Sequence, residues 1–327
     1  MRLGGIAAYM TEVNNRQDIQ EAIAWADEHQ LPAIMIGEGS NIIWNDDGFP
    51  GLVLVNKIQG FEVTGDFGTS KYITAGSGLN WDEFVAQTVD MGLTGIEFLS
   101  LVPGTVGGTP VQNVGAYGAE VSQTIVTVEA YDRQAKVFVT LRGTDCNFAY
   151  RTSRFKTTDR GRFFITNVCF ALEQGLPQPP FYGALQRYFN EHNLTDITPK
   201  VVREAVIAIR SAKLPDPRQV ANNGSFFANP IIESSAFVQL LNDYPDIAHW
   251  GVDDSKVKLS AAWLIEHAGF KDYHDPETGM GTWPSQPLVL VNEHAEKTAQ
   301  LLAFKQKIVD AVSQKFGIVL EQEPELI

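Results

Sequence analysis

Glycine-rich segments are the first feature of this sequence that could do chemistry. They are Gly37-Glu38-Gly39-Ser40-Asn41, Gly76-Ser77-Gly78, and Pro103-Gly104-Thr105-Val106-Gly107-Gly108, which runs on to Gln112-Asn113-Val114-Gly115-Ala116-Tyr117-Gly118. Glycine permits positive φ and lets backbone N–H groups approach an anion closely. One such segment would be an ordinary turn between strands, whereas several together suit a pyrophosphate.

The glycine spacing does not fit the two commonest nucleotide motifs. After Gly37 and Gly39, the third glycine of a Rossmann fingerprint is missing, because position 42 is Ile. No GxxxxGK[ST] sequence is present either. We therefore disfavour a Rossmann-type NAD site and a P-loop NTPase.

Metal and thiol chemistry have little support. The two cysteines, Cys146 and Cys169, have no CxxC spacing, so a disulfide scaffold and a zinc site are both disfavoured and a reducing cytoplasm is expected. No HExxH motif occurs, and no histidine lies within the glycine-rich segments. The histidines are His29, His192, His249, His267, His274 and His294.

Composition excludes several classes of protein. The chain of 327 residues can form about two or three domains. It carries 25 Lys and Arg against 39 Asp and Glu, a net charge of −14, which argues against binding to nucleic acid or an acidic membrane surface. No run of about eighteen apolar residues predicts a membrane span, and the N-terminus lacks the apolar region of a signal peptide.

The elements that must position these segments alternate between helices and strands. Apolar spacing predicts a helix at 15–30 followed by strands at 33–36 and 51–55, a small β-α-β-β unit. Further predicted helices are 80–91, 182–192, 199–213, 234–242, 259–268 and a long one after Asn292. Further predicted strands are 61–64, 71–74, 163–172, 287–291 and 317–321, with a hairpin of 126–131 and 136–141.

Six motifs, in order along nearly the whole chain, resemble the UDP-N-acetylenolpyruvoylglucosamine reductase family. Two of the motifs are the first and third glycine-rich segments, and Phe98-Leu99-Ser100-Leu101-Val102 precedes the third segment. The other four are Tyr150-Arg151-Thr152-Ser153-Arg154-Phe155-Lys156, Lys213-Leu214-Pro215-Asp216-Pro217, Gly224-Ser225-Phe226-Phe227-Ala228-Asn229-Pro230 and Leu320-Glu321-Gln322-Glu323. The resemblance implies an α+β fold: an FAD-binding fold of the vanillyl-alcohol-oxidase type in two lobes, plus an α+β substrate-binding domain. We expect lobe 1 at 1–60 with the strand 317–327, lobe 2 at 61–200, and the substrate-binding domain at 205–316.

The resemblance also implies a reaction, the NADPH-dependent reduction of UDP-N-acetylglucosamine enolpyruvate to UDP-N-acetylmuramate in peptidoglycan precursor synthesis. It assigns Arg151 to stabilising charge on the substrate carboxylate, Ser225 to donating a proton, and Glu323 to assisting the enol. A surface ion pair is the alternative for Arg151, and a turn or cap is the alternative for Ser225. Pro324 follows Glu323, and the chain stops at 327, so Glu325 is an alternative acidic partner.

Further residues match positions that hold the cofactor or the nucleotide sugar in the family. The implied cofactor-binding residues are Gly37, Gly39, Ser40, Asn41, Pro103, Gly104, Thr105, Gly107, Gly108, Asn113, Gly115, Ala116, Gly118 and Arg210. The implied substrate-binding residues are Tyr182, Lys213, Asn229 and Gln286, and the Tyr182 element resembles the subtype with a Tyr-bearing substrate loop. Position 228 is Ala, where relatives often carry Lys.

The expected cofactor is non-covalent FAD, because no histidine or cysteine lies in the flavin motifs to attach it. NADPH is the expected co-substrate, and we expect a monomer in the cytoplasm without nucleic-acid or membrane partners. Two alternatives stay open. One is a flavin oxidase of the same fold, which the Arg151 and Ser225 motifs disfavour. The other is a flavoprotein that has lost catalysis and only binds nucleotide sugars, which the altered tail and Ala228 keep open.

Overall fold

The computed structural model describes all 327 residues, which form two compact units. The N-terminal unit consists of Ala7–Ser40 and Pro50–Ala212, and the C-terminal unit of Met1–Ile6, Asn41–Phe49 and Lys213–Ile327. The final residues share the C-terminal unit with Met1–Ile6 and Asn41–Phe49 as well as with 213–316, and the predicted three-part division stays a prediction. The predicted finer division of the N-terminal unit into two lobes stays a prediction.

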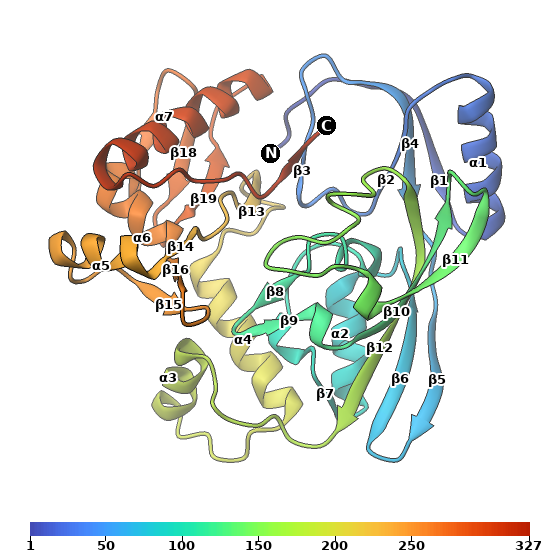
Figure 1. The fold of residues 1–327 in the computed structure, drawn as a ribbon, viewed down its shortest axis with the longest axis horizontal. Helices are drawn as coiled ribbons and strands as arrows, with labels where there is room; N and C mark the ends of the chain where they lie inside the picture. The colour runs from blue at the N-terminus through green and yellow to red at the C-terminus, as the bar shows by residue number, and fades with distance from the viewer. The chain divides into compact units, whose positions relative to one another are not determined.

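The N-terminal unit begins with a small sheet and one helix (Figure 1). The sheet has the order β1-β4-β2, and β2 and β4 are parallel. Its elements are β1 (Ala7–Val13), α1 (Arg16–Glu28), β2 (Ala33–Ile36) and β4 (Phe49–Asn56). The Asn15 side chain caps α1 by accepting from the Asp18 amide, and the helix buries Ile19, Ile23 and Ala26 on one face. The predicted helix and its two flanking strands are confirmed, whereas β1 was not predicted because most of its residues are exposed.

A larger antiparallel sheet forms the centre of this unit. Its strand order is β11-β10-β12-β6-β5, with β7 pairing with β12. The strands are β5 (Phe61–Phe67), β6 (Ser70–Gly76), β7 (Leu93–Thr94), β10 (Ile125–Asp132), β11 (Val137–Arg142) and β12 (Phe163–Gln174), and a separate pair is β8 (Gly115–Ala116) with β9 (Ala119–Glu120). The predicted strands and the β10–β11 hairpin are confirmed.

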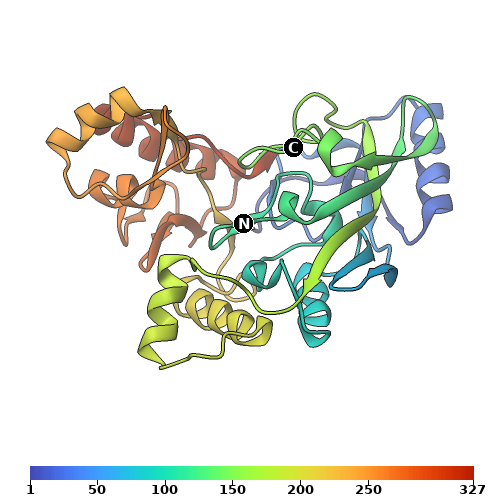
Figure 2. The ribbon, with the colours of Figure 1, turned by 60° about the horizontal axis from the view of Figure 1, so that its bottom comes forward.

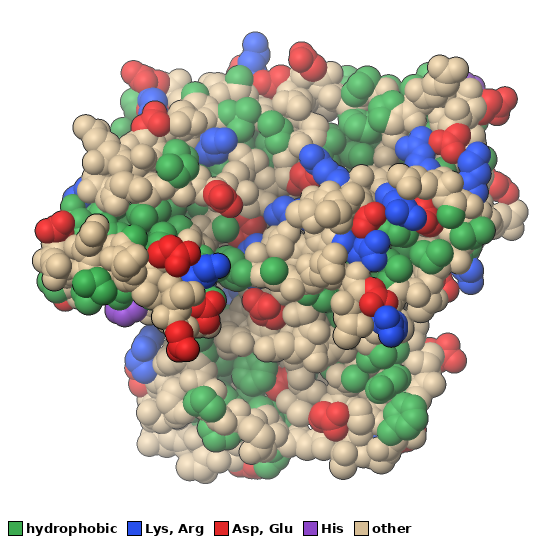
Figure 3. Space-filling model, in the orientation of Figure 1, with side chains coloured by type: hydrophobic (Ala, Val, Ile, Leu, Met, Phe, Trp, Pro, Cys, Tyr) green, Lys and Arg blue, Asp and Glu red, His purple; other side chains and the backbone are tan.

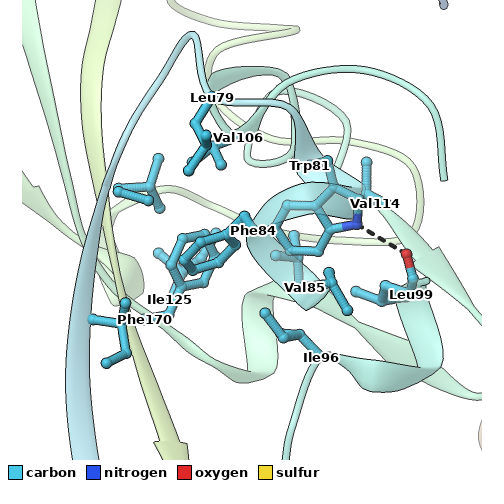
Figure 4. Packing of buried hydrophobic residues seen from close by; sticks show 14 of the residues in the cluster. Leu79, Trp81, Phe84, Val85, Ile96, Leu99, Val106, Val114, Ile125 and Phe170 are labelled. Carbon is cyan, nitrogen blue, oxygen red and sulfur yellow. Dashed lines mark hydrogen bonds between the residues drawn. The ribbon is translucent and has the colours of Figure 1, made fainter. Parts of the chain in front are cut away.

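The core of this unit also anchors the glycine-rich segments. Helix α2 (Trp81–Asp90) buries Trp81 and Phe84 against the sheet, and the Trp81 indole donates to the Leu99 carbonyl at 2.9 Å (Figure 4). Leu79 and Val106 lie in the same cluster. Leu79 directly follows the second glycine-rich segment and Val106 lies within the third, so burial of these apolar side chains holds the loops on the sheet.

Two helices complete the N-terminal unit, α3 (Gly183–Glu191) and α4 (Pro199–Lys213), as predicted. They lie side by side and share a small core of their own (Figure 2). That core consists of Leu185, Phe189, Val202, Ala205 and Val206.

The C-terminal unit contains three small sheets and three helices. Strand orders are β13-β19-β18-β17 and β14-β16-β15, and β20 pairs with β3. The elements are β3 (Ile42–Ile43), β13 (Asn222–Ser225), β14 (Ile231–Glu233), α5 (Ser234–Asp243), β15 (His249–Gly251), β16 (Lys256–Leu259), α6 (Ala261–Ile265), β17 (His274–Asp275), β18 (Met280–Trp283), β19 (Gln286–Asn292), α7 (Thr298–Phe316) and β20 (Glu325–Leu326). After Ile265 the predicted helix continues as a π-helical turn, Glu266–Phe270.

The predicted strand at 317–321 does not form. Gly317 ends α7 in the left-handed conformation, with φ 68°, and the only strand beyond it is β20, which runs parallel to β3. Long-range contacts explain the difference. The tail pairs with the segment Asn41–Phe49, which is distant in sequence, and with the residues that follow β13. None of the helices combines the length and apolar character needed to cross a bilayer.

Candidate active site

The three glycine-rich segments meet in the N-terminal unit. The Gly104 amide donates to one carboxylate oxygen of Glu38 at 3.1 Å, and the Asn80 side chain donates to the other at 2.7 Å. The Gly107 amide donates to the Ser77 carbonyl at 2.8 Å. Glu38 therefore links the first segment to the third, and the backbone of the second runs along the third.

Glycine is required at several contacts between these loops. A Cβ on Gly37 would lie 2.3 Å from the Thr105 Oγ1, and one on Gly107 would lie 2.6 Å from the Ser77 Cβ. Gly104 has a φ of 118°, a conformation that side chains rarely adopt. The backbone at these glycines consequently lies against a neighbouring loop with no room for a side chain.

Arg151 lies at a tight turn that holds the third segment. Its φ is 53°, and its guanidinium donates to the Gly115 carbonyl at 2.6 Å and the Asn113 carbonyl at 3.5 Å. From the same motif, the Ser153 hydroxyl donates to the Val111 carbonyl at 2.6 Å. The Tyr-Arg-Thr-Ser motif thus fixes the path of 111–115, and Arg151 lies beside the predicted flavin loop.

The side chain of Asn113 lies inside the third glycine-rich segment. Its side chain is fully buried and donates to Glu120 at 2.8 Å and to the Ala149 carbonyl at 3.1 Å, while it accepts from the Ser122 amide at 3.1 Å. These contacts give the side chain a role in shaping the loop. The predicted cofactor contact at Asn113 stays a prediction.

Arg210 and Tyr182 also come close to the third segment within this unit. Arg210 lies on α4, and its Nε is buried without a hydrogen-bond partner. Burial lowers the pKa of Arg210, and the nearby Tyr117 and Asp82 act in the opposite direction. Tyr182, before α3, packs edge-on against Tyr117 with ring centroids 5.8 Å apart, and burial raises the pKa of Tyr182.

Ser225 and Glu323 lie close together in the C-terminal unit. Ser225 ends β13 opposite Val289 of β19, after a bulge in which Gly224 has a φ of 68°. The amide of Glu323 donates to the carbonyl of the neighbouring Phe226 at 2.9 Å. The tail is therefore paired with the chain immediately after Ser225.

Asn41, predicted to bind the cofactor, joins this group. Its side chain donates to the Glu323 carbonyl at 3.4 Å, and its own carbonyl accepts from the Glu325 amide at 2.9 Å. Glu325 belongs to β20 and pairs with Ile42, whereas Glu323 pairs with the residue after Ser225. The choice of Glu323 over Glu325 as the acidic partner stays a prediction.

The residues expected to bind the nucleotide sugar have definite positions in this unit. The Trp283 indole donates to the Lys213 carbonyl at 3.1 Å, and Gln286 is opposite Trp283 in the register of β18 and β19, so Lys213 and Gln286 both adjoin this tryptophan. Desolvation lowers the pKa of Lys213. Asn229 accepts from the Ala261 amide at 2.9 Å at the start of α6, so it positions this helix besides any role toward substrate.

Sequence reasoning missed two carboxylates, Glu38 and Asp82. Negative side chains are unexpected beside a site for a phosphate, and only the packing of the loops shows that they bind amides and arginines instead. The sequence signal available for Glu38 was its place between two glycines of the first segment. No group of three His, Cys, Asp or Glu side chains is arranged to hold a metal ion.

Comparison with known proteins identifies the domain that holds the glycine-rich segments. Residues 7–141 match the family described as FAD binding domain, and they contain all three glycine-rich segments. The site of backbone loops and a buried arginine fits the diphosphate of FAD, because Arg210 Nε lacks a partner and Gly39, Gly108 and Gly118 leave open space where a Cβ would stand. The fold and this site define an FAD-binding protein.

The rest of the chain specifies the family. Residues 216–327 match the C-terminal domain of UDP-N-acetylenolpyruvoylglucosamine reductase. The chain is 39% identical to that reductase from Ralstonia nicotianae, with coverage of 100% of this chain and 95% of the relative, and 40% identical to that from Cupriavidus pinatubonensis, with coverage of 97% and 93%. This chain belongs to the UDP-N-acetylenolpyruvoylglucosamine reductase family.

A solved structure supports the fold. The reductase from Thermus caldophilus superposes with a TM-score of 0.66 at 20% identity, covering 97% of this chain and 91% of the other. The α+β class and the FAD-binding fold predicted from the motifs are thereby confirmed.

Proposed function

We propose that this chain catalyses the NADPH-dependent, FAD-mediated reduction of UDP-N-acetylglucosamine enolpyruvate to UDP-N-acetylmuramate. Family membership over the full length supports this activity. The observation that carries it for this particular chain is the pairing of Glu323 with the backbone next to Ser225. The proposed proton donor on β13 and the proposed acidic partner on the tail thus belong to neighbouring segments, which suits reduction of an enol ether.

The N-terminal unit binds the cofactor. FAD would supply hydride transfer between NADPH and the methylene carbon of the enolpyruvyl group. The glycine-rich loops and the guanidinium of Arg210 would hold its diphosphate, with Glu38 keeping the first and third loops together.

Three side chains act on the enolpyruvyl group. As electrons arrive at the methylene carbon, negative charge develops next to the substrate carboxylate, and Arg151 stabilises it by electrostatic and bidentate hydrogen-bonding interactions. Glu323 assists the enol form. Ser225 Oγ donates the proton that completes the saturated lactyl ether, and its position at the end of a paired strand fixes where that proton is delivered.

The remaining predicted residues bind the nucleotide sugar. Lys213 and the Tyr182 hydroxyl supply a cation and a donor for the UDP diphosphate, and Asn229 and Gln286 supply amides for hydrogen bonds. Ala228 contributes no cation here, which leaves Lys213 with more of the electrostatic attraction. On the face shown in Figure 3, Lys and Arg are interspersed with Asp and Glu rather than gathered in a patch. We further propose that the enzyme works as a monomer in the cytoplasm.

An anaerobic experiment tests the function. The purified protein, reconstituted with FAD, is reduced with NADPH, and UDP-N-acetylglucosamine enolpyruvate is then added while the visible absorbance is followed. We expect the oxidised-flavin bands to return on addition of the sugar. Bands that return only when oxygen is admitted would favour an oxidase, and absence of flavin after reconstitution would overturn the proposal.

A further inference from the structure

Asp82, in the first turn of α2, connects two parts of the predicted flavin site in the N-terminal unit. Its carboxylate accepts two hydrogen bonds from the Arg203 guanidinium, at 2.5 and 2.9 Å, and one from the Leu101 amide, at 2.5 Å. Arg203 belongs to α4, and Leu101 stands just before Pro103 and Gly104 of the third glycine-rich segment. One carboxylate therefore joins a helix to the entry of a phosphate-binding loop.

The Arg203 contact fixes the orientation of α4. Arg203 and Arg210 are separated by about two helical turns and so lie on the same face of that helix. A bidentate pair is geometrically specific, and the Asp82 and Arg203 side chains are only 26% and 16% exposed. Anchoring at Arg203 consequently sets the rotation of the helix, and with it the direction of Arg210.

The Leu101 contact stabilises a strained part of the loop. Leu101 has a φ of 58°, an unfavourable conformation for a residue with a side chain, and it is 38% exposed, so packing alone holds it weakly. A charged acceptor on its amide opposes relaxation of this backbone toward negative φ. The peptides that follow, through Gly104, are thereby kept in place.

The electrostatics agree with an ionised Asp82. Burial alone would raise the pKa of this carboxyl, but the hydrogen bonds from Arg203 and Leu101 and the charge of Arg210 lower it overall. The negative charge also offsets part of the repulsion between the two arginines of α4. Loss of the charge is therefore expected to disturb both arginines and not only the residue that Asp82 contacts.

We propose that Asp82 is a positioning residue of the flavin diphosphate site, acting through Arg203 on Arg210 and through Leu101 on the Gly104 loop. This inference rests on the proposed function, because it concerns how the same site holds FAD.

The test measures FAD affinity by titrating the apoprotein and following flavin fluorescence. Asp82→Asn and Arg203→Met should each weaken FAD binding roughly tenfold to a hundredfold, the range for losing hydrogen bonds to a charged group. The double variant should be little weaker than either single one, because both remove the same contact. The matched control is Glu83→Gln, the exposed neighbour in the same helical turn, which should bind FAD like the wild type.

Two further measurements separate positioning from folding. With saturating FAD, Asp82→Asn should regain nearly the wild-type kcat and flavin spectrum, whereas Asp82→Glu should recover part of the FAD affinity. Unchanged FAD affinity in Asp82→Asn would overturn the inference. It would also be overturned if the loss of FAD affinity accompanied a fall in Tm and if saturating FAD did not restore kcat. If the wild-type protein binds no FAD, the proposed function and this inference are both overturned. The wild type is therefore titrated with FAD before any variant is made.

Discussion

The two units differ in how their proposed functional residues are held. In the N-terminal unit, the proposed phosphate site is made of glycine-rich loops, and side chains such as Glu38 and Asn113 hold these loops in place. In the C-terminal unit, the proposed chemistry is carried by side chains, with Ser225 on a paired strand and Glu323 on the tail beside it. We therefore expect cofactor binding to be sensitive to backbone geometry and catalysis to be sensitive to single functional groups.

This difference predicts separable effects of mutation. A change at Ser225 removes one group without moving the strand, because backbone pairing and the buried Phe226 and Phe227 hold it. A change at a packed glycine displaces a loop and lowers affinity for the cofactor. The four predictions below test this separation.

Ser225→Ala is expected to have the largest effect. Flavin reduction by NADPH should be nearly unchanged, while reoxidation by the enolpyruvyl sugar should slow by ~10²–10⁴-fold, the usual contribution of general acid catalysis. Stopped-flow absorbance measures both steps, and Ser313→Ala on α7 is the control. A loss below about tenfold would remove Ser225 from the role of proton donor.

Arg151→Gln tests both effects. This arginine holds a loop of the proposed flavin site and is proposed to stabilise negative charge on the substrate. We expect the reoxidation rate to fall by roughly 10²–10³-fold, as for removal of one electrostatic stabiliser of a transition state. FAD affinity should also fall, because the side chain holds the Gly115 carbonyl in the loop. We expect this fall to be smaller than the loss of rate. Arg142→Gln, at an exposed ion pair, serves as control, and FAD loss without a slower chemical step would contradict the catalytic assignment.

Gly37→Ala tests the packing of the glycine-rich loops in the N-terminal unit. The added Cβ would overlap Thr105, so the first and third loops must separate, and FAD affinity should fall about tenfold to a hundredfold, since overpacking costs about 1–3 kcal/mol. Once saturated with FAD, the variant should keep most of its kcat. Gly251→Ala, where a Cβ meets open space, is the control in the other unit. Equal FAD affinity in the two variants would argue against tight loop packing.

Lys213→Gln should have the smallest effect, about a tenfold rise in KM for the nucleotide sugar, from loss of a charged hydrogen bond. Because desolvation lowers the pKa of Lys213, its charge is present at low pH and is lost at a lower pH than for a free lysine. The wild-type KM should therefore rise with increasing pH, and Lys213→Arg should delay this rise. Lys136→Gln is the exposed control. A pH-independent KM in the wild type would speak against contact between Lys213 and the diphosphate.

Much of the architecture could be predicted from local pattern. Helices such as α1 and α4 follow from apolar spacing and caps, and the strands at the centre of the larger sheet follow from apolar runs. Errors came where long-range contacts decide the structure. The tail does not form the strand predicted at 317–321, because its partners, Ile42 and Phe226, are far away in sequence.

The candidate site shows the same limit. Residue types and order indicated a diphosphate site, a serine donor and an arginine, since glycine, serine and arginine have distinct chemistry wherever they stand. They could not show that Asn113 is enclosed, that Glu38 bridges two loops, or that Asp82 joins α4 to Leu101. Those contacts depend on which backbone atoms folding brings within about 3 Å of each other, which local sequence does not encode. Chemistry was therefore decided by residue identity, and its placement by tertiary packing.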